Sequence, residues 1–400
     1  MRISKSNYIN DIDYQKQIID SFPEPQSDYD RVDFNYLVLR KVKGISVKRL
    51  IFEVASVFAI PILLVLYTIN RLCYRNKKQN IGKTIIIESY NRKGKAYDFE
   101  GRVPEFGIDY NPVFIYKTGA FPKITGGVIG RTALKIYLKF VCRHPFWFFY
   151  NLRCLVNLMG YNKLLYLHSP KAIVNSRMEV NPMSSIISCL CESCGCEFIC
   201  FMHGEVMIDI NTAFVRFSYF YIWDHYYIDV FKWSRCDMGH YVIYKPELYM
   251  LPDSSVTLPR YYLTYYLTGN EKNGVDLKAN EICKILVDIS KSGKRCKVRP
   301  HPRWSSLDQL KLIFDKTNIE IEQCKIVPVK DSILDSEVVI GTFSSVLTEA
   351  YYLGKKVYID DVSDPALIKE LVMKKYFLLS KEVGFLSELL NDQIKVRPQI

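Results

Sequence analysis

The sequence lacks several patterns that would assign it at once to a class. Its start is not a charged segment followed by an apolar core and a small-residue cleavage site, so we expect no secretory signal and a reducing compartment. Its 12 cysteines do not form the paired Cys-x-x-Cys spacing of a zinc site. No base-stacking signature of the RNA-recognition kind is present either, so nucleic acid is not an expected partner.

The densest cysteine cluster runs from Cys189 to Cys200 in "CLCESCGCEFIC". A metal or redox site is the less favoured interpretation of this segment. We expect instead a helix end that leads into a buried strand, with its thiols behaving as small apolar side chains.

What the sequence does contain is material for packed cores. Of its 400 residues, 49% are hydrophobic and 14% aromatic, which excludes general disorder and is enough for two domains of ordinary size. The formal net charge of +12 favours an anionic partner, such as membrane phosphates or a phosphorylated substrate.

The longest apolar run lies within residues 50–78, where 17 uncharged residues separate Glu53 from Arg71. Basic residues flank the run on both sides, and Pro61 interrupts it. Three interpretations stay open: a buried core helix, a helix lying on an anionic membrane surface, and a membrane-spanning helix near the lower length limit.

Alternating strand-like and helix-like patterns after residue 80 predict parallel sheets. Expected strands include residues 83–89, 163–169, 261–269 and 325–329, and expected helices include 275–291 and 306–315. The predicted fold class is α/β, with two Rossmann-like domains and an N-terminal apolar helix, for which membrane association is one of the open interpretations. The predicted parts are an N-terminal segment (1–80), a first domain (81–245), a linker (246–260) and a second domain (261–400).

Small hydroxyl residues follow one predicted strand of the second domain, in "IGTFSSVLTEA". Gly341, Thr342, Ser344 and Ser345 form a turn that opens a helix, where free backbone N–H groups and the helix dipole favour a phosphate. Ordinary helix N-capping by a serine is the alternative.

A second basic segment, "RPHPR", holds His301 between two prolines and two arginines at another predicted strand end. Such a histidine can bind a phosphate or protonate a departing phosphate oxygen, although a rigid basic loop would show the same pattern. The two segments lie about 40 residues apart, and we expect them on adjacent strand ends as one nucleotide-phosphate site.

Taken together, residues 299–303 and "VVIGTFSSVLTEAYYLGKKVYI" resemble the HP and serine-pair motifs of bacterial sialyltransferases of the GT-B (two-Rossmann) type. The likeness extends more loosely to bacterial polysaccharide transferases with RPHP and HG motifs, and it covers roughly residues 160–360. It implies that His301 contacts the donor phosphate and assists departure of CMP, while Ser344 and Ser345 hold phosphate.

The resemblance is incomplete, because the acidic motif that supplies the base in those sialyltransferases has no clean copy here. Instead "FMHGEV" resembles the HG motif of glycerophosphate polymerases, so His203 or Glu205 is the expected base, with a structural His-Gly turn as the alternative. Carboxylates at Glu88, Asp98 and Glu100 form a second candidate region.

The resulting prediction is an inverting glycosyltransferase that moves sialic acid from CMP-sialic acid to a hydroxyl of a bacterial surface glycan, without a metal or other cofactor. The expected catalytic residues are His203, Glu205 and His301. The expected substrate-binding residues are Arg299, Pro302, Arg303, Gly341, Thr342, Ser344, Ser345 and Glu349.

Expected partners are the nucleotide sugar, a glycan or lipid-linked glycan acceptor, and the anionic inner face of the cytoplasmic membrane, where the protein would be peripheral. Alternative interpretations are a Kdo or CDP-polyol phosphate transferase and a non-catalytic nucleotide-binding scaffold of glycan assembly.

Overall fold

The computed structural model describes residues 12–43, 47–75, 84–89, 111–116, 125–176, 178–181, 183–202, 204–244, 258–268, 278–302 and 305–395. The chain divides into two compact units. Unit 1 comprises Met1–His203 and Ile208–Tyr244, and unit 2 comprises Gly204–Met207 and Lys245–Ile400. Each unit is described by itself below.

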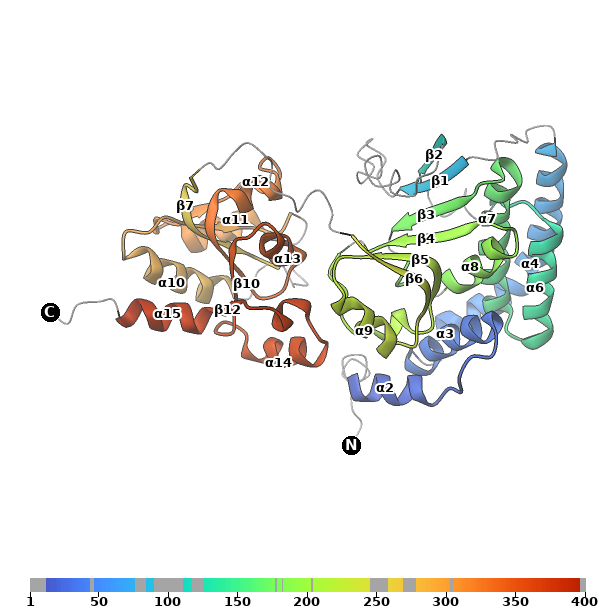
Figure 1. The fold of residues 1–400 in the computed structure, drawn as a ribbon, viewed down its shortest axis with the longest axis horizontal. Coiled ribbons are helices and arrows are strands. Elements are labelled where there is room, and N and C mark those ends of the chain that lie inside the picture. Colours follow the sequence, from blue (N-terminus) through green and yellow to red (C-terminus); the bar gives the residue numbers. More distant parts are fainter. Residues whose placement is uncertain are drawn as a thin grey trace. The chain divides into compact units, whose positions relative to one another are not determined.

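Unit 1 is built on a six-stranded sheet in the order β2-β1-β3-β4-β5-β6, with all neighbouring strands parallel (Figure 1). The strands are β1 (Thr84–Ser89), β2 (Asn111–Tyr116), β3 (Ala172–Ser176), β4 (Glu197–Phe201), β5 (Arg216–Ile222) and β6 (Asp237–Ile243). Strand β4 is buried from Phe198 onward, which explains its apolar sequence, because a parallel strand is covered on both faces.

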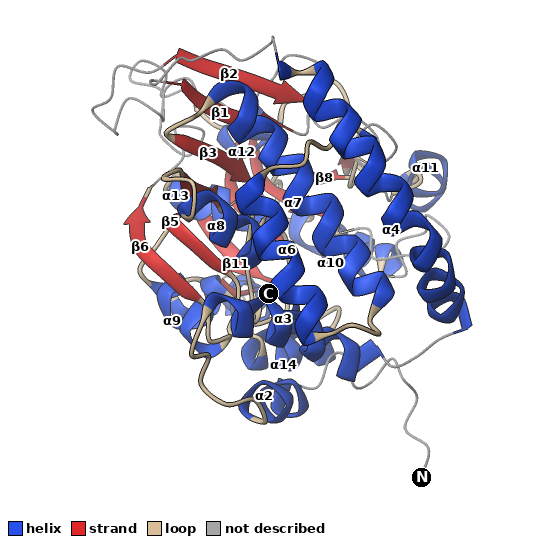
Figure 2. Ribbon diagram, turned by 90° about the vertical axis from the view of Figure 1, so that its right-hand side faces the viewer, coloured by secondary structure: helices blue, strands red, loops and turns tan. Residues whose placement is uncertain are grey.

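The helices of unit 1 are α2 (Ile12–Asp20), α3 (Asp28–Lys43), α4 (Val47–Cys73), α6 (Arg131–Arg143), α7 (Phe148–His168), α8 (Ser184–Glu192), the short η3 (Ile210–Thr212) and α9 (Tyr226–Trp233). Helix α8 packs on β4 and β5, and α7 contacts α8. Helix α7 also contacts both α4 and α6, which lie on its two sides (Figure 2).

Unit 2 contains a second six-stranded parallel sheet, in the order β12-β11-β10-β7-β8-β9. Its strands are β7 (Tyr261–Tyr266), β8 (Cys296–Arg299), β9 (Glu320–Ile321), β10 (Ser336–Gly341), β11 (Lys356–Ile359) and β12 (Gly384–Phe385). The chain moves outward from β7 through β8 to β9 and then returns to the other side of β7 with β10. The point between β7 and β10 is therefore the topological switch point of the sheet.

Helices connect these strands: α10 (Ala279–Ser290), α11 (Leu307–Phe314), α12 (Val329–Leu334), α13 (Ser345–Tyr352), α14 (Pro365–Met373), η5 (Phe377–Ser380) and α15 (Leu386–Lys395). The core of unit 2 forms where the buried face of α10, with Ile282, Leu286 and Ile289, meets Leu263 and Val298 of the sheet. The two parallel sheets with connecting helices confirm the expected α/β class with two Rossmann-like units.

The structure corrects three expectations about individual elements. Residues 163–169 are the end of helix α7 and its cap, and the strand follows at Ala172–Ser176. Residues 325–328 form no strand, and Val329 begins helix α12. Strands β8 and β10 are not neighbours, because β7 lies between them.

Helix α4 contains the apolar run and is not a buried core helix. Of its segment Leu50–Cys73, only 17% of the most apolar window is buried, and the segment is long and apolar enough to cross a membrane. The buried-core interpretation of residues 50–78 is therefore wrong.

Candidate functional site at the carboxyl edge of the second sheet

The best-defined site lies at the switch point of the sheet in unit 2. Strand β10 ends at Gly341, and residues 342–344 turn into helix α13. A Cβ atom on Gly341 would stand 3.0 Å from the carbonyl oxygen of Tyr266, at the end of β7. Glycine therefore lets the two strand ends approach closely at the point where α/β sheets bind ligands.

Ser344 is the N-cap of α13. Its backbone is extended, and its hydroxyl accepts a hydrogen bond from the Val346 N–H at 3.2 Å. Ser345 occupies the first helical position and has a partly exposed side chain. The predicted serine pair therefore divides into one serine that caps the helix and one that stands at its positive end, available to an anion.

Tyr376 packs against this turn. Its fully buried ring lies edge-on to Phe343 at 5.3 Å, and its hydroxyl donates to the Ser344 carbonyl at 3.4 Å. Burial, together with the nearby Glu205 carboxylate, raises the pKa of Tyr376 well above its usual value, so the phenol keeps its proton.

Arg299, at the end of β8, is directed inward. Its guanidinium pairs with Glu322 and donates to the carbonyl of Val327 at 2.9 Å, and only 7% of the residue is exposed. Glu322 also accepts from Lys297 at 2.6 Å and from Ser332 at 2.7 Å. Burial opposes ionisation of Glu322, but these donors outweigh it and lower its pKa. In this structure the Arg299 side chain therefore fixes the end of β8, and its contact with a phosphate stays a prediction.

His301 follows Arg299 and is partly exposed. Its backbone N–H donates to the Ser305 hydroxyl at 2.9 Å, and the Ser305 N–H donates back to the His301 carbonyl at 3.2 Å. Pro302 is exposed, whereas Arg303 lies outside the described residues. Because parallel strands stand about 4.8 Å apart, the ends of β8 and β10 are about 10 Å apart across β7. His301 and the serine turn therefore share one edge without being adjacent.

Glu349 lies one turn along α13 from Ser345 and is partly buried. Burial raises the pKa of its carboxyl to about 7, although Arg299 acts in the opposite direction. Near neutral pH this group therefore exists in both protonation states, so it can donate a hydrogen bond to a ligand hydroxyl or accept one from it. Thr342 is buried next to the turn.

Glu205 belongs to the short segment that clusters with unit 2. It accepts a hydrogen bond from the Thr348 hydroxyl at 2.9 Å and from the Phe377 N–H at 3.4 Å. These contacts bring it to α13, where Thr348 lies four residues after the capping Ser344 and therefore on the same side of the helix. His203 lies outside the described residues, as do Asp98 and Glu100, while of Glu88 only the backbone in β1 is described.

Sequence reasoning missed three contributors to this site: Thr348, Tyr376 and the buried Lys297–Glu322 pair. Thr348 lies within the quoted "VLTEA" segment, where its hydroxyl could have been noted. Tyr376 carries no motif, and a charged pair is ordinarily expected on the surface. Among the described residues, no group of three or more histidine, cysteine, aspartate or glutamate side chains is arranged to hold a metal ion.

Known proteins resemble this chain only distantly. No protein-family model matches the chain, and no curated protein matches it. Among solved structures, UDP-GlcNAc 2-epimerase from Methanocaldococcus jannaschii, in complex with UDP-GlcNAc and UDP, aligns with 10% identity. That alignment covers 79% of this chain and 93% of the other, with a TM-score of 0.42.

The wall teichoic acid polymerase TagF aligns with 12% identity, over 88% of this chain and 98% of the other, with a TM-score of 0.40. A UDP-N-acetylglucosamine 2-epimerase from Listeria monocytogenes aligns with 11% identity over 78% of this chain and 87% of the other, with a TM-score of 0.46. At such values the likeness carries no argument about activity.

Proposed function

We propose that the chain is a glycosyltransferase of bacterial surface-glycan synthesis that takes its donor sugar from a nucleotide. The observation that carries the proposal is the turn from Gly341 to Ser345 at the switch point of the sheet in unit 2. It combines a close approach of two strand ends, the positive end of the α13 helix dipole and the Ser345 hydroxyl beside the capping Ser344, which together favour the phosphate of a nucleotide.

The proposed roles follow from the geometry of this edge. Ser345 and the N–H groups at the start of α13 bind the donor phosphate. His301 lies at the same edge and stabilises the leaving phosphate, either as a hydrogen-bond donor or by transferring a proton. Glu349 binds a hydroxyl of the donor, because its carboxyl is protonated in part near neutral pH. Arg299 positions His301 through the buried pair with Glu322.

For the donor we propose CMP-sialic acid, on the resemblance of "RPHPR" and "GTFSSVLTEA" to the sialyltransferase motifs. The reaction would invert the anomeric centre, with a base deprotonating the acceptor hydroxyl while CMP departs from the opposite face. We keep His203 and Glu205 as the proposed bases. The carboxylate of Glu205 already accepts hydrogen bonds from the Thr348 hydroxyl and the Phe377 N–H. This favours His203 as the base.

A second candidate is a Kdo or CDP-polyol phosphate transferase. The His203-Gly204 pair favours it, since this pair resembles the HG motif of the polyol-phosphate polymerases. Both candidates place a cytidine nucleotide at the same phosphate site and differ in the group transferred.

The test is thermal-shift measurement of the full chain with CMP, CDP, UDP and GDP, followed by turnover assays with the matching activated donors. A ligand bound to the native state raises its stability, so CMP or CDP should raise the melting temperature most. His301→Ala should lose turnover while the cooperative melt is retained. A response to UDP alone would overturn the donor assignment, and stabilisation by none of the four nucleotides would overturn the proposed phosphate site.

A further inference from the structure

We propose that helix α4 lies in the plane of an anionic phospholipid membrane, with its outer face immersed among the lipids, and that it does not span the bilayer. The inference goes beyond the proposed function, because it concerns a different surface in unit 1 and does not depend on which donor is used.

The outer face of α4 is apolar along the whole run. Ten large apolar side chains of this helix are at least two-fifths exposed, among them Phe58 at 67% and Ile62 at 66%. They are Leu50, Ile51, Phe52, Val54, Val57, Phe58, Ile62, Val65, Ile69 and Leu72. Contiguous exposed apolar surface of this extent marks an interaction site in a folded protein.

The few polar groups of α4 are satisfied within the protein. Thr68, on the exposed side, donates its hydroxyl to the Leu64 carbonyl at 2.8 Å within the helix. The only carboxylate between residues 47 and 73, that of Glu53, is directed toward α7 and accepts a hydrogen bond from the Phe149 N–H at 2.8 Å. Contact with lipid would therefore leave neither of these groups without a partner.

The inner face fixes α4 to unit 1 from one end to the other. Near its start, Glu53 binds the first turn of α7, and near its end Asn70 donates to the carbonyls of Thr125 and Gly127 at 2.9 and 2.8 Å. Between them, the ring of Tyr67 is fully buried against Gly127. Helix α4 is thus a docked part of a folded unit.

This docking decides between lying in the membrane and crossing it. From Leu50 to Leu72 the helix is about 33 Å long, which equals the thickness of a bilayer core. If α4 crossed the bilayer, α7 would have to enter with it, together with Arg153 and Lys163, at a high cost for each charge. Immersion of the outer face alone leaves α7 packed within unit 1, without moving it across the lipid core.

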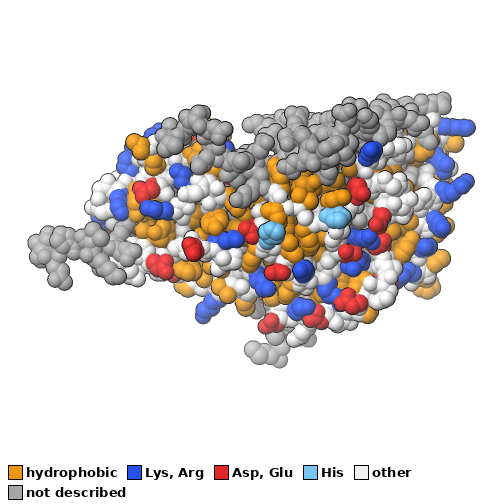
Figure 3. Space-filling model, in the orientation of Figure 1, with side chains coloured by type: hydrophobic (Ala, Val, Ile, Leu, Met, Phe, Trp, Pro, Cys, Tyr) orange, Lys and Arg blue, Asp and Glu red, His pale blue; other side chains and the backbone are white. Residues whose placement is uncertain are grey.

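Basic and aromatic groups stand where lipid headgroups would be. Arg71 lies in the last turn of α4 and Arg75 just after it, and both are exposed. Phe146, 81% exposed, lies in the turn just before α7, three residues from Phe149, whose N–H binds Glu53 of α4. Lys and Arg side chains gather along the edge of unit 1 formed by α4 and α6 (Figure 3). Such a distribution complements anionic headgroups.

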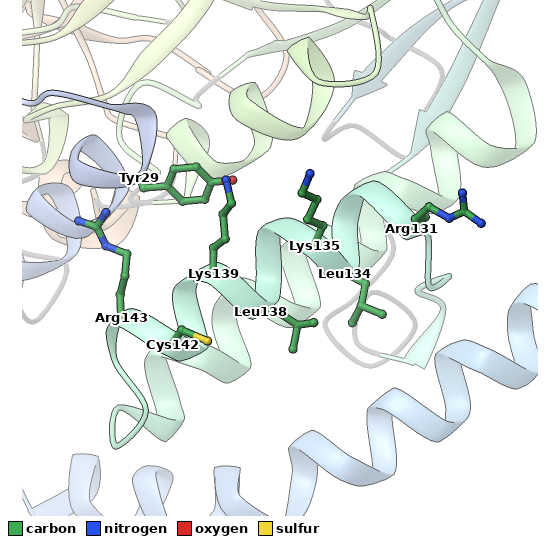
Figure 4. Close-up of a pocket in the computed structure, with 8 residues that line it drawn as sticks. All are labelled: Tyr29, Arg131, Leu134, Lys135, Leu138, Lys139, Cys142 and Arg143. Atoms are coloured by element: carbon green, nitrogen blue, oxygen red, sulfur yellow. The ribbon is translucent and has the colours of Figure 1, made fainter.

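Helix α6, on the other side of α7, has the same two-sided character. Leu134, Leu138 and Cys142 lie on one side of this helix, and Lys135 and Lys139 lie on the other (Figure 4). With Tyr29, Arg131 and Arg143, these residues line a shallow depression of about 660 Å³. An amphipathic basic helix of this kind is typical of a membrane surface and would extend the contact made by α4.

The test uses the full chain and sedimentation with vesicles of phosphatidylcholine, with and without phosphatidylglycerol. The double variant Phe58→Glu/Ile62→Glu should reduce binding to the anionic vesicles at least about tenfold, because two large apolar side chains no longer enter the lipid. The matched control, Leu312→Glu/Ile326→Glu in unit 2, alters side chains of similar exposure and should leave binding unchanged. The melting temperatures of both variants are measured to check that each is folded.

Equal binding of the wild type and the α4 double variant would overturn the proposal. So would equal binding of the wild type to vesicles with and without phosphatidylglycerol, because the basic groups would then contribute nothing. If the double variant instead converts a dimer to a monomer in light scattering and leaves vesicle binding intact, α4 contacts a second copy, and the proposal fails.

Labelling distinguishes an in-plane helix from a spanning one. In a variant with exposed Cys73, Cys142 and Cys194 replaced by serine, one cysteine is introduced either by Lys41→Cys, in α3 before the start of α4, or by Arg75→Cys, two residues after the end of α4. An impermeant maleimide applied to sealed, inverted membrane vesicles should label both positions alike. Labelling of only one position would show that α4 spans the membrane.

Discussion

The ammonium group of Lys297 and the carboxylate of Glu322 lie 2.6 Å apart where both side chains are at least 95% buried, just beneath the edge that carries His301. Arg299 binds the same carboxylate, so one anion serves two cations. Removing the anion would leave the buried Arg299 without a carboxylate partner and Lys297 with only the more distant Asp335, 3.7 Å away. Breaking a buried ion pair by removing one partner costs far more free energy than the pair itself contributes to stability.

We therefore expect Glu322→Gln to lower the free energy of unfolding by about 3–5 kcal/mol. Glu337→Gln, which breaks the exposed pair with Lys356, should change it by less than about 1 kcal/mol. Denaturant unfolding of both variants measures the difference. Similar small losses in the two variants would mean that the buried cluster does not support the end of β8.

The two serines of the turn should be separable by experiment. Ser344→Ala removes the cap of α13 and should cost about 1 kcal/mol of stability. Ser345→Ala removes no cap bond and should leave stability unchanged, yet it should weaken binding of the nucleotide that stabilises the wild type. Melting curves with and without that nucleotide report both effects. A loss of stability in Ser345→Ala equal to that in Ser344→Ala would contradict the assignment of the cap.

The raised pKa of Glu349 predicts how the free energy of unfolding changes with pH. Because its pKa is raised to about 7, the folded state holds the proton more tightly than the unfolded chain does. Its contribution is present below the unfolded pKa of about 4.5 and is lost as the pH rises toward 7. Glu349→Gln should therefore match the wild type near pH 4 and exceed it above pH 7, by about 3 kcal/mol at most.

The comparison for Glu349 is the exposed glutamate of α10, by Glu281→Gln, measured over the same pH range. We expect the stability of Glu281→Gln to differ from that of the wild type by the same small amount at every pH. A wild type that equals Glu349→Gln in stability at every pH would show that the carboxyl of Glu349 is solvated in solution.

Substitution by alanine should change stability in opposite directions at two glycines: Gly127, which lies against Met159 of α7, and Gly160, inside α7. A Cβ on Gly127 would stand 2.8 Å from the ring of Tyr67 and 2.9 Å from the Cβ of Met159, so Gly127→Ala should destabilise unit 1 by about 1–3 kcal/mol. A Cβ on Gly160, inside α7, would meet nothing within 4 Å, so Gly160→Ala should stabilise by up to about 1 kcal/mol. Equal effects in the two variants would argue against the close docking of α4 on α7.

Much of the fold of unit 2 could be predicted, because its local patterns agree with its final structure. "SEVVIGTFSS" reads as a buried strand followed by a turn, and the structure has β10 followed by the Ser344 cap. The spatial order of strands could not be predicted in this way. That β7 separates β8 from β10 depends on which edges meet in three dimensions, and no local pattern records it.

The errors have equally local causes. "KLLYLHS" is short and apolar enough to suit a strand, but it continues the helix that began at Phe148, and the helix ends in the left-handed conformation of Ser169. The burial of Arg299 is also not visible in the sequence, because its partner Glu322 lies 23 residues later; its predicted contact with a phosphate stays a prediction. Periodicity indicates faces and element types, whereas pairing between distant side chains has no periodic trace.

The position of β7 also has a consequence for how unit 2 is made. This strand comes first in the sequence of the sheet yet lies in its interior, and its partners arrive 33 residues later in β8 and 75 residues later in β10. Closing loops of that length before any pairing is gained slows folding. During synthesis β7 would emerge from the ribosome with both edges unpaired, and one of them would stay open until residue 341 has been translated. A nascent chain stalled before that point would present an unpaired strand edge to neighbouring chains, which makes translation of residues 266–341 an interval in which aggregation is favoured.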